Sequence, residues 1–204
     1  MNFNFNNSAP QSNSNNAVLN LRKNDVLDLS KVAPSLRNVI LGAGWSVAET
    51  GPSFDLDISA FLLNSRNVVE RIPDDVIFFN HQAAPGIHSE GDNLTGGDGN
   101  TDDERIDIAL DQLDPRIQKI VFIVTIFEAQ AKRQTFGMIN SSYVRLMDQD
   151  NGDKEICRFS LNDRFSTDTG MIFAELYKEN GNWKFKALGE GFIGDLNTVI
   201  QKYR

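Results

Sequence analysis

The sequence predicts a mainly β protein of the all-β class, a β-sandwich of about ten short strands with one C-terminal helix. Three observations support this prediction. From Ala17 onward, short apolar runs alternate with turn residues, which is typical of strands. Apolar residues recur convincingly at helical spacing only in Asp195–Tyr203. A hydrophobic fraction of 40%, with 14 Phe among 204 residues, is enough to build a substantial core.

The expected strands are apolar or alternating runs bounded by turn-forming residues. In chain order they are Val18–Leu21, Val26–Leu29, Asn38–Leu41, Phe54–Leu63, Val76–Phe79, Ile106–Leu110, Lys119–Phe127, Tyr143–Met147, Glu155–Leu161, Ile172–Tyr177 and Trp183–Leu188. Asn151-Gly152 lies between two strand patterns and predicts a hairpin turn. That interpretation is favoured over an ion-binding loop for Asp148–Asp153.

The C-terminal helix is predicted from one apolar stripe and one polar start. The stripe has the spacing i, i+3, i+4, i+7 and consists of Leu196, Val199, Ile200 and Tyr203. Asp195 stands near the expected N-terminus of the helix. Asp111–Gln118 and Asn162–Thr169 are each left open as a single helical turn.

The domain organisation follows from composition. Residues 1–16 read MNFNFNNSAPQSNSNN, an Asn/Ser-rich segment with too little apolar content to pack. We therefore expect a flexible arm over 1–16 and a single domain over 17–204. The arm lacks the apolar stretch of a secretory signal, and Ile120–Phe127, the longest nearly continuous apolar run, is far shorter than the ~20 residues of a membrane helix. With one cysteine, Cys157, the chain is expected to be cytoplasmic.

The charge is concentrated in one stretch. The net charge is -8 and the pI about 4.8, which argues against nucleic acid and anionic lipid as partners. Between Arg71 and Arg105 there is no Lys or Arg, yet that stretch holds eight acids, while the rest of the chain is balanced. The eight acids are Asp74, Asp75, Glu90, Asp92, Asp98, Asp102, Asp103 and Glu104.

The loop from Gly91 to Glu104 reads GDNLTGGDGNTDDE and is the first candidate site. Calcium takes six to eight oxygens from carboxylates, Asn side chains and carbonyls, and glycines let such a loop fold back on itself. Clustered carboxylates repel one another unless a cation compensates them. The loop is not an EF-hand, because counting from Asp98 the sixth position is Asp103 instead of Gly and the twelfth is Ala109 instead of Glu.

The second candidate is Phe54–Ser59, which reads FDLDIS. Strand alternation places Asp55 and Asp57 on one face, about 6.6 Å apart along the chain. Two carboxylates entering an apolar strand need a counter-charge. They could complete a cation site with the acidic loop, or begin a phosphotransfer D-x-D motif of the haloacid-dehalogenase type. The latter needs an apolar strand directly before the first Asp, whereas Glu49–Ser53 predicts a turn.

Other motifs are interpreted as structural. Gly189–Gly194 matches G-x-G-x-x-G, but the chain ends ten residues later, so a strand-to-helix turn is favoured over a dinucleotide site. His81, His88 and Cys157 are too few for a zinc site or a Cys–His or Ser–His–Asp centre.

Taken together, the chain resembles the TerD-domain family of bacterial tellurium-resistance and general stress proteins, from about Val18 to Tyr203. The combination FDLD, GDN-x-TG and DDE in this order is highly specific. The supporting segments are LRKNDVLDL at 21–29, LGAGW at 41–45, FDLDISAFLL at 54–63, GDNLTG at 91–96, DDERI at 102–106, QTFG at 134–137 and WKFKALGEG at 183–191.

The resemblance implies a β-sandwich that binds Ca²⁺, expected as two ions, through the DLD strand and the GDN…DDE loop. Carried onto this sequence, the implied metal ligands are Asp55, Asp57, Asp92, Asn93, Asp98, Asp102, Asp103 and Glu104. The loop is one residue longer than the family pattern, so Asn100 is an alternative to Asp98. The implied partners are other stress-response proteins, a membrane-associated complex included.

The function expected from these observations is a non-enzymatic, calcium-binding stress-response protein in which Ca²⁺ orders the acidic loop for interaction with a partner. One alternative is a Mg²⁺-dependent phosphohydrolase with Asp55 as nucleophile. A third interpretation, a nucleotide binder, lacks the basic residues or helix N-terminus that phosphate binding needs at the candidate loop.

Overall fold

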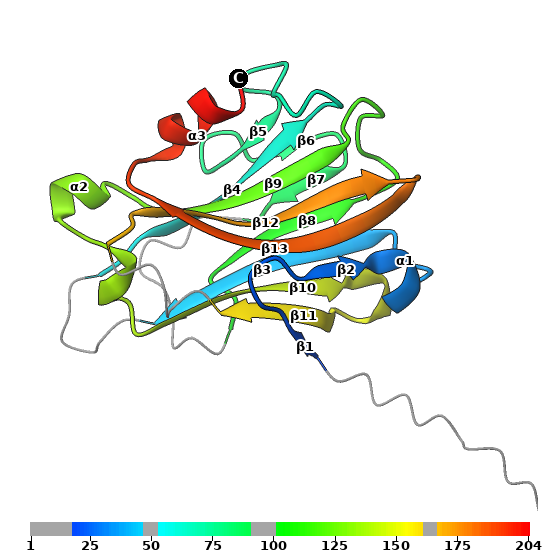
Figure 1. Cartoon of the computed structure of the whole chain (residues 1–204), viewed down its shortest axis with the longest axis horizontal. Coiled ribbons are helices and arrows are strands. Elements are labelled where there is room, and N and C mark those ends of the chain that lie inside the picture. The colour runs from blue at the N-terminus through cyan, green and yellow to red at the C-terminus, as the bar shows by residue number, and fades with distance from the viewer. Residues whose placement is uncertain (1–17, 47–52, 91–100, 161–166) are drawn as a thin grey trace, which may run out of the picture.

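Two β-sheets pack face to face in the computed structural model, which describes residues 18–46, 53–90, 101–160 and 167–204 (Figure 1). Sheet A contains, in spatial order, β1 (Leu19–Asn20), β11 (Lys154–Ser160), β10 (Ser141–Asp148), β3 (Asn38–Ser46), β8 (Glu104–Ala109), β7 (Ile87–Ser89) and β6 (Ala83–Ala84). Sheet B contains β2 (Val26–Asp28), β13 (Asn182–Phe192), β12 (Gly170–Glu179), β9 (Lys119–Ile126), β4 (Leu56–Leu63) and β5 (Val76–Ile77). β1 pairs with β11 in parallel, and the other neighbouring strands are antiparallel.

The helices are short and lie outside the two sheets. They are α1 (Leu29–Val32), α2 (Ala129–Lys132) and α3 (Leu196–Lys202), with 3₁₀ turns η1 (Phe136–Met138) and η2 (Gln149–Asn151). Asp195 caps α3, because its side chain accepts hydrogen bonds from the backbone N–H groups of Asn197 and Thr198. None of the helices in the described ranges is long and apolar enough to cross a membrane.

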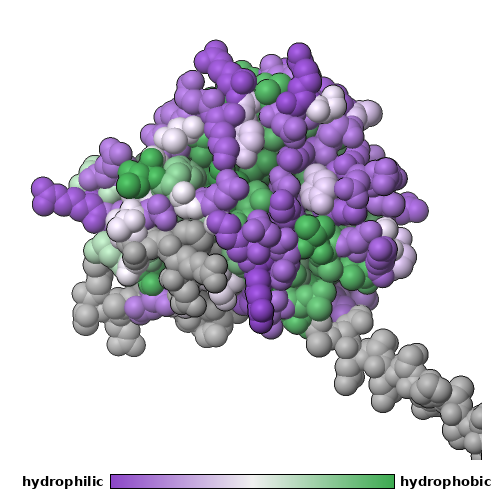
Figure 2. All heavy atoms as spheres, viewed as in Figure 1, coloured by the Kyte–Doolittle hydropathy of each residue, from purple (hydrophilic) through white to green (hydrophobic). Residues whose placement is uncertain are grey.

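The core has two parts, and β4 contributes to both. Leu56, Ile58 and other alternate residues of β4 belong to the large cluster between the sheets. Phe61 and Leu63 face the other way and join a second cluster that packs beneath α3. Hydrophilic side chains cover most of the face seen in Figure 2, with smaller hydrophobic areas between them. Both faces of β4 are therefore buried, so a polar side chain on this strand enters an apolar environment.

The predicted fold is confirmed, since the structure is mainly strands in two sheets with a small C-terminal helix. Each predicted strand overlaps an observed one, and the hairpin predicted at Asn151-Gly152 joins the antiparallel strands β10 and β11. Asp150 supports that hairpin by accepting hydrogen bonds from the backbone N–H groups of Arg37 and Asn38. Residues 111–118 form turns and no helix, and most of Asn162–Thr169 and the arm 1–16 lie outside the described residues.

Two strand predictions end well before the observed strands do, in both cases at a glycine. β3 continues past Leu41 through Gly42 and Gly44 to Ser46, and β13 continues through Gly189 and Gly191 to Phe192. A glycine inside a strand usually destabilises it, so these residues predicted the end of the strand. In β3 glycine is required because neighbouring groups cover the backbone: an added Cβ would meet the Asp102 carboxylate at Gly42 and the Tyr143 ring at Gly44. The G-x-G-x-x-G segment is thus mostly strand, with only Ile193–Asp195 linking to α3.

The prediction also missed a short hairpin. β6 and β7 contain two and three residues and are joined through Gly86, whose φ is +76°. Strands of this length carry too few residues for an alternating pattern to be recognised. β7 matters for the site because it pairs with β8 beside the acidic segment.

The single thiol is buried and hard to ionise. Cys157 is 1% exposed in the inter-sheet core, and burial raises its pKa to about 12. Because the thiolate is the reactive form of cysteine, we expect a thiol reagent to leave native Cys157 unmodified at neutral pH and to modify it stoichiometrically in denaturant. An absorbance assay with an aromatic disulfide reagent measures the extent of modification of Cys157 in the native and in the denatured chain. Rapid modification of the native chain would show that β11 opens readily.

Candidate metal centre

The edge of β4 at residues 54–58, here called the β4 edge, carries Asp55 and Asp57 and is contacted by Glu104. β9 pairs with the whole length of β4, from Leu56 to Leu63. On the opposite side, among the described residues, strand pairing by β5 is limited to Ala60 and Phe61. The backbone N–H of Ile58 therefore points to an edge that β5 does not cover.

Glu104 occupies this edge. It is the first residue of β8 in sheet A and is 6% exposed. Its Oε2 accepts a hydrogen bond of 2.6 Å from the backbone N–H of Ile58 in sheet B, the residue after Asp57. Glu104 thus links the DDE segment to the DLD strand across the sandwich, although the two residues are 46 positions apart. A buried carboxylate in this place supplies an oxygen that a cation could share.

Trp45 makes a second connection between the DDE segment and the start of β4. Its backbone N–H donates to Asp103 Oδ2 at 2.8 Å, and its indole Nε1–H donates to the carbonyl oxygen of Phe54 at 3.3 Å. The backbone N–H of Asp103 donates to the carbonyl of Ala43 at 2.8 Å. Through Trp45, the DDE segment is held next to the residue that precedes Asp55.

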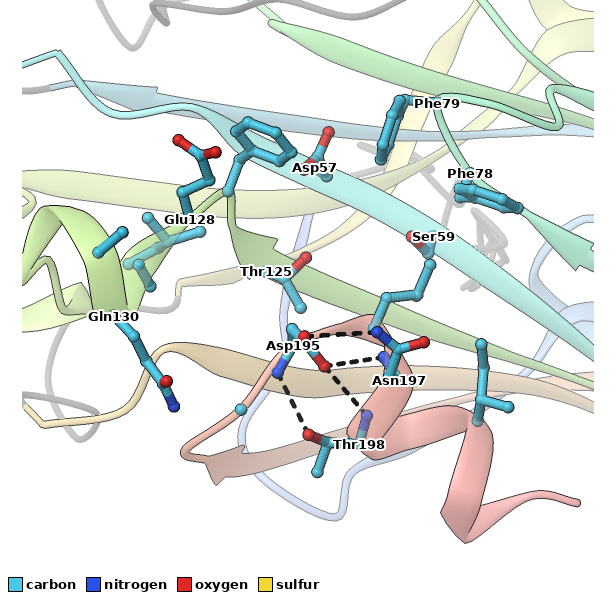
Figure 3. A pocket seen from close by; sticks show the side chains of 17 residues that line it. Asp57, Ser59, Phe78, Phe79, Thr125, Glu128, Gln130, Asp195, Asn197 and Thr198 are labelled. Atoms are coloured by element: carbon cyan, nitrogen blue, oxygen red, sulfur yellow. Dashed lines mark hydrogen bonds between the residues drawn. The ribbon is translucent and has the colours of Figure 1, made fainter.

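Asp55 and Asp57 are buried at the β4 edge. Their exposed fractions are 9% and 7%, and alternation along the strand places them on the face opposite Leu56 and Ile58. Figure 3 shows Asp57 projecting from β4 into a cavity, between Glu128 and Phe79. Buried carboxylates are costly unless positive charge or hydrogen-bond donors compensate them. Asp55 and Asp57 are therefore candidates for binding a cation, together with oxygens from other segments.

Asp102 has a different environment. Its carboxylate accepts hydrogen bonds from Arg145 at 2.8 and 2.9 Å and from the Tyr143 hydroxyl at 3.0 Å. Burial together with the Asp102 charge raises the pKa of Tyr143 to about 12. Arg145 also donates to Glu155 at 3.0 Å. The guanidinium therefore already neutralises Asp102, and the structure does not bring Asp102 into the group at the β4 edge.

The remaining candidate ligands, Asp92, Asn93 and Asp98, lie outside the described residues. Glu90, the last described residue before them, lies beside β8, because its backbone N–H donates to the carbonyl of Arg105 at 3.0 Å. In the described ranges, no three Asp, Glu, His or Cys side chains form a group that could hold a metal ion. Those carboxylates alone therefore do not complete the six to eight oxygens of a calcium site.

A cavity of about 690 Å³ lies next to the β4 edge, on the outer face of sheet B between β9, α2 and α3. Its lining includes Asp57, Glu128 and Asp195 and the aromatic residues Phe78, Phe79 and Phe127. The sequence gives no sign of this cavity, because Phe79 and Phe127 at the ends of predicted strands look the same whether they fill a core or line a cavity. The three acids come from separate segments and carry no common motif.

Comparisons with known proteins agree with the architecture. A TerD-domain family model matches residues 18–203. Tellurium resistance protein TerD of Serratia marcescens is 44% identical over 188 residues, covering 91% of this chain and 96% of that protein. General stress protein 16U of Bacillus subtilis (strain 168) is 38% identical over 191 residues, covering 91% and 97%. The crystal structure of a homologue of telluride resistance protein TerD from Streptomyces coelicolor A3(2) superimposes with a TM-score of 0.65 at 24% identity, covering 81% and 96%.

Proposed function

This chain belongs to the TerD-domain family, and from that premise we propose that it is a calcium-binding stress-response protein that acts by binding and not by catalysis. Relatives named for tellurium resistance and for general stress support a role of that type. The observation that carries the proposal is the Glu104–Ile58 hydrogen bond, because it joins the two acidic segments at one end of the sandwich.

In this proposal the ion is held by Asp55, Asp57, Asp103 and Glu104, with further oxygens from Asp92, Asn93 and Asp98. Calcium would supply positive charge to buried carboxylates and would connect sheet A to sheet B through oxygens of both. Both effects favour the folded chain over the unfolded one. Asp102 serves the site indirectly, because its pairing with Arg145 fixes the start of the DDE segment against β10.

In this proposal, calcium binding creates a surface that another stress-response protein binds. Binding of Ca²⁺ would reduce the repulsion within the acidic stretch and so favour one arrangement of it, which a partner could recognise. The chain's own reactive groups argue for binding over redox chemistry on a tellurium oxyanion, since Cys157 is buried with a raised pKa.

The phosphohydrolase alternative gains no support. That chemistry uses an Asp placed at the end of an apolar strand that leads into it. Here Asp55 comes directly before β4, which is antiparallel to both β9 and β5.

Calorimetric titration tests the proposal. We expect Ca²⁺ to bind with a Kd of about 10⁻⁷–10⁻⁵ M, the range of sensor sites, and equimolar Mg²⁺ not to displace it, because the oxygens come from several segments and suit a large coordination shell. Displacement of Ca²⁺ by an equal concentration of Mg²⁺ would contradict the proposal. Absence of calcium heat, with no shift in melting temperature, would contradict it as well.

A further inference from the structure

We propose that the cavity on the outer face of sheet B binds a small organic cation, an alkylammonium group on a short apolar stem. The cavity is lined by β4, β9 and the segments around α2 and α3, and its volume of about 690 Å³ is within the usual range for small-molecule sites. The proposal goes beyond calcium binding and rests on the aromatic and acidic side chains of this cavity.

The lining carries charge of one sign. Asp57, Glu128 and Asp195 all border the cavity, and among its described lining residues there is no Lys or Arg. The three carboxylates come from β4, the start of α2 and the start of α3, so they surround the space from different sides (Figure 3). A cavity with low-dielectric walls and acids on several sides concentrates cations and repels anions.

Aromatic rings provide the second feature that would bind a cation in this cavity, after the carboxylates. Phe79 stands edge-to-face to Phe78 at 5.5 Å and to Phe127 at 6.0 Å between ring centroids. Phe79 and Phe127 remain 37% and 38% exposed, so their rings are accessible to a ligand. Aromatic faces next to carboxylates form the environment in which proteins bind ammonium groups through cation–π contacts.

The chain's own lysine illustrates this preference at the rim. Lys132 Nζ lies 5.0 Å from the centroid of the Phe127 ring and 3.9 Å from a carboxylate oxygen of Glu128. One aromatic ring and one acid of the cavity thus already accommodate an ammonium. Phe79, Asp57 and Asp195 belong to the same lining and offer a ligand the same two features, an aromatic ring and carboxylates.

The test uses choline and its uncharged isostere 3,3-dimethylbutan-1-ol, which have the same shape and differ in charge. Ligand-observed NMR titrations are carried out on the full chain, once in excess chelator and once in excess Ca²⁺. We expect choline to bind about tenfold more tightly than the alcohol in chelator. Equal binding of the two probes, or binding of neither, would overturn the proposal.

Variants locate the site. Phe79→Leu keeps apolar volume but removes the ring, and we expect it to weaken choline binding roughly two- to fivefold. Asp195→Asn removes a charge and keeps the α3 cap, since Asn caps as well as Asp, and should weaken choline binding similarly. Glu179→Gln, at the last residue of β12 and outside the cavity lining, is the matched charge control and should have no effect. If Phe79→Leu and Asp195→Asn bind choline like the parent chain, the cavity is not the site.

These outcomes are distinct from those for calcium. Phe79→Leu and Asp195→Asn should leave the calorimetric calcium titration unchanged, because neither residue is among the proposed metal ligands. A chain that binds Ca²⁺ but not choline would overturn the cavity proposal alone. A chain that binds choline but not Ca²⁺ would overturn the calcium proposal alone.

Discussion

Calcium at a thousandfold excess over its Kd is expected to raise the free energy of unfolding by about 4 kcal/mol. The unfolded chain lacks the convergence of the β4 edge with Glu104, so it has little affinity for the ion. The gain follows from mass action and should appear as a concentration-dependent rise in melting temperature. Differential scanning calorimetry in chelator and in increasing Ca²⁺ measures it.

Asp57→Asn should remove most of this gain without unfolding the protein in chelator. Asp57 is 7% exposed and lies one residue from the Ile58 amide that Glu104 binds, so its neutralisation reduces repulsion in the metal-free state and removes negative charge from the proposed metal site. The metal-free variant should therefore melt at the same temperature as the parent chain or slightly higher.

Asp111→Asn is the matched control, because Asp111 is an exposed acid just after the other end of β8. It should retain the full calcium effect. A loss of stability in Asp57→Asn that is equal in chelator and in Ca²⁺ would show that Asp57 is structural. The site would then reduce to the acidic loop and the DDE segment.

Arg116→Met is expected to lower the free energy of unfolding by about 3 kcal/mol. The Asp75 side chain is 1% exposed and takes two hydrogen bonds from the Arg116 guanidinium, one of them 2.8 Å long at Oδ2. Without Arg116, Asp75 keeps the backbone N–H groups of Glu70 and Arg71 but loses its main counter-charge. Urea unfolding at neutral pH measures the loss.

The effect of Arg116 should depend on pH in a defined direction. Burial raises the pKa of Asp75, but the hydrogen bonds and charges of Arg116 and Arg71 together more than offset it, so the folded pKa lies below the ordinary 3.8. A lowered folded pKa contributes stability above the unfolded pKa and loses it as pH falls through the folded value. The difference between the parent chain and Arg116→Met should thus shrink below about pH 4.

Arg71→Met is the control for this pair. Arg71 is 51% exposed and its guanidinium lies 3.6 Å from Asp75 Oδ1, so its loss should cost less than about 1 kcal/mol. Equal effects of the two arginine variants at neutral pH would contradict the assignment of Arg116 as the main partner of Asp75.

Local pattern was sufficient for the fold class because most strands here are long enough to alternate and are bounded by turn residues. The local pattern gave wrong strand ends where tertiary contacts determine whether a strand continues. Gly42 and Gly44 look like strand breakers, yet Asp102 and Tyr143 pack against the backbone there and β3 continues. The hairpin of β6 and β7 is too short to leave a periodic signal.

The candidate site, too, could be predicted only in part from the sequence. Resemblance and charge pattern indicated the DLD strand and the DDE segment, and the structure brings Glu104 to the β4 edge as that pairing requires. The partner of Asp102 could not be read from the sequence, because Arg145 is 43 residues away and only the register of β3, β8 and β10 brings the two together. The cavity depends on α3 folding over sheet B, which no single motif encodes.

Terbium luminescence tests the central claim, that the metal binds at the β4 edge, most directly. Tb³⁺ takes calcium sites through oxygen ligands and emits when a nearby indole is excited. The chain has two indoles, Trp45 and Trp183, and Trp45 is hydrogen-bonded to Asp103 and to Phe54 beside Asp55. We expect strong sensitised emission that Ca²⁺ quenches by displacement, that Trp45→Phe abolishes and that Trp183→Phe leaves intact. Emission that survives in Trp45→Phe and disappears in Trp183→Phe would contradict the account.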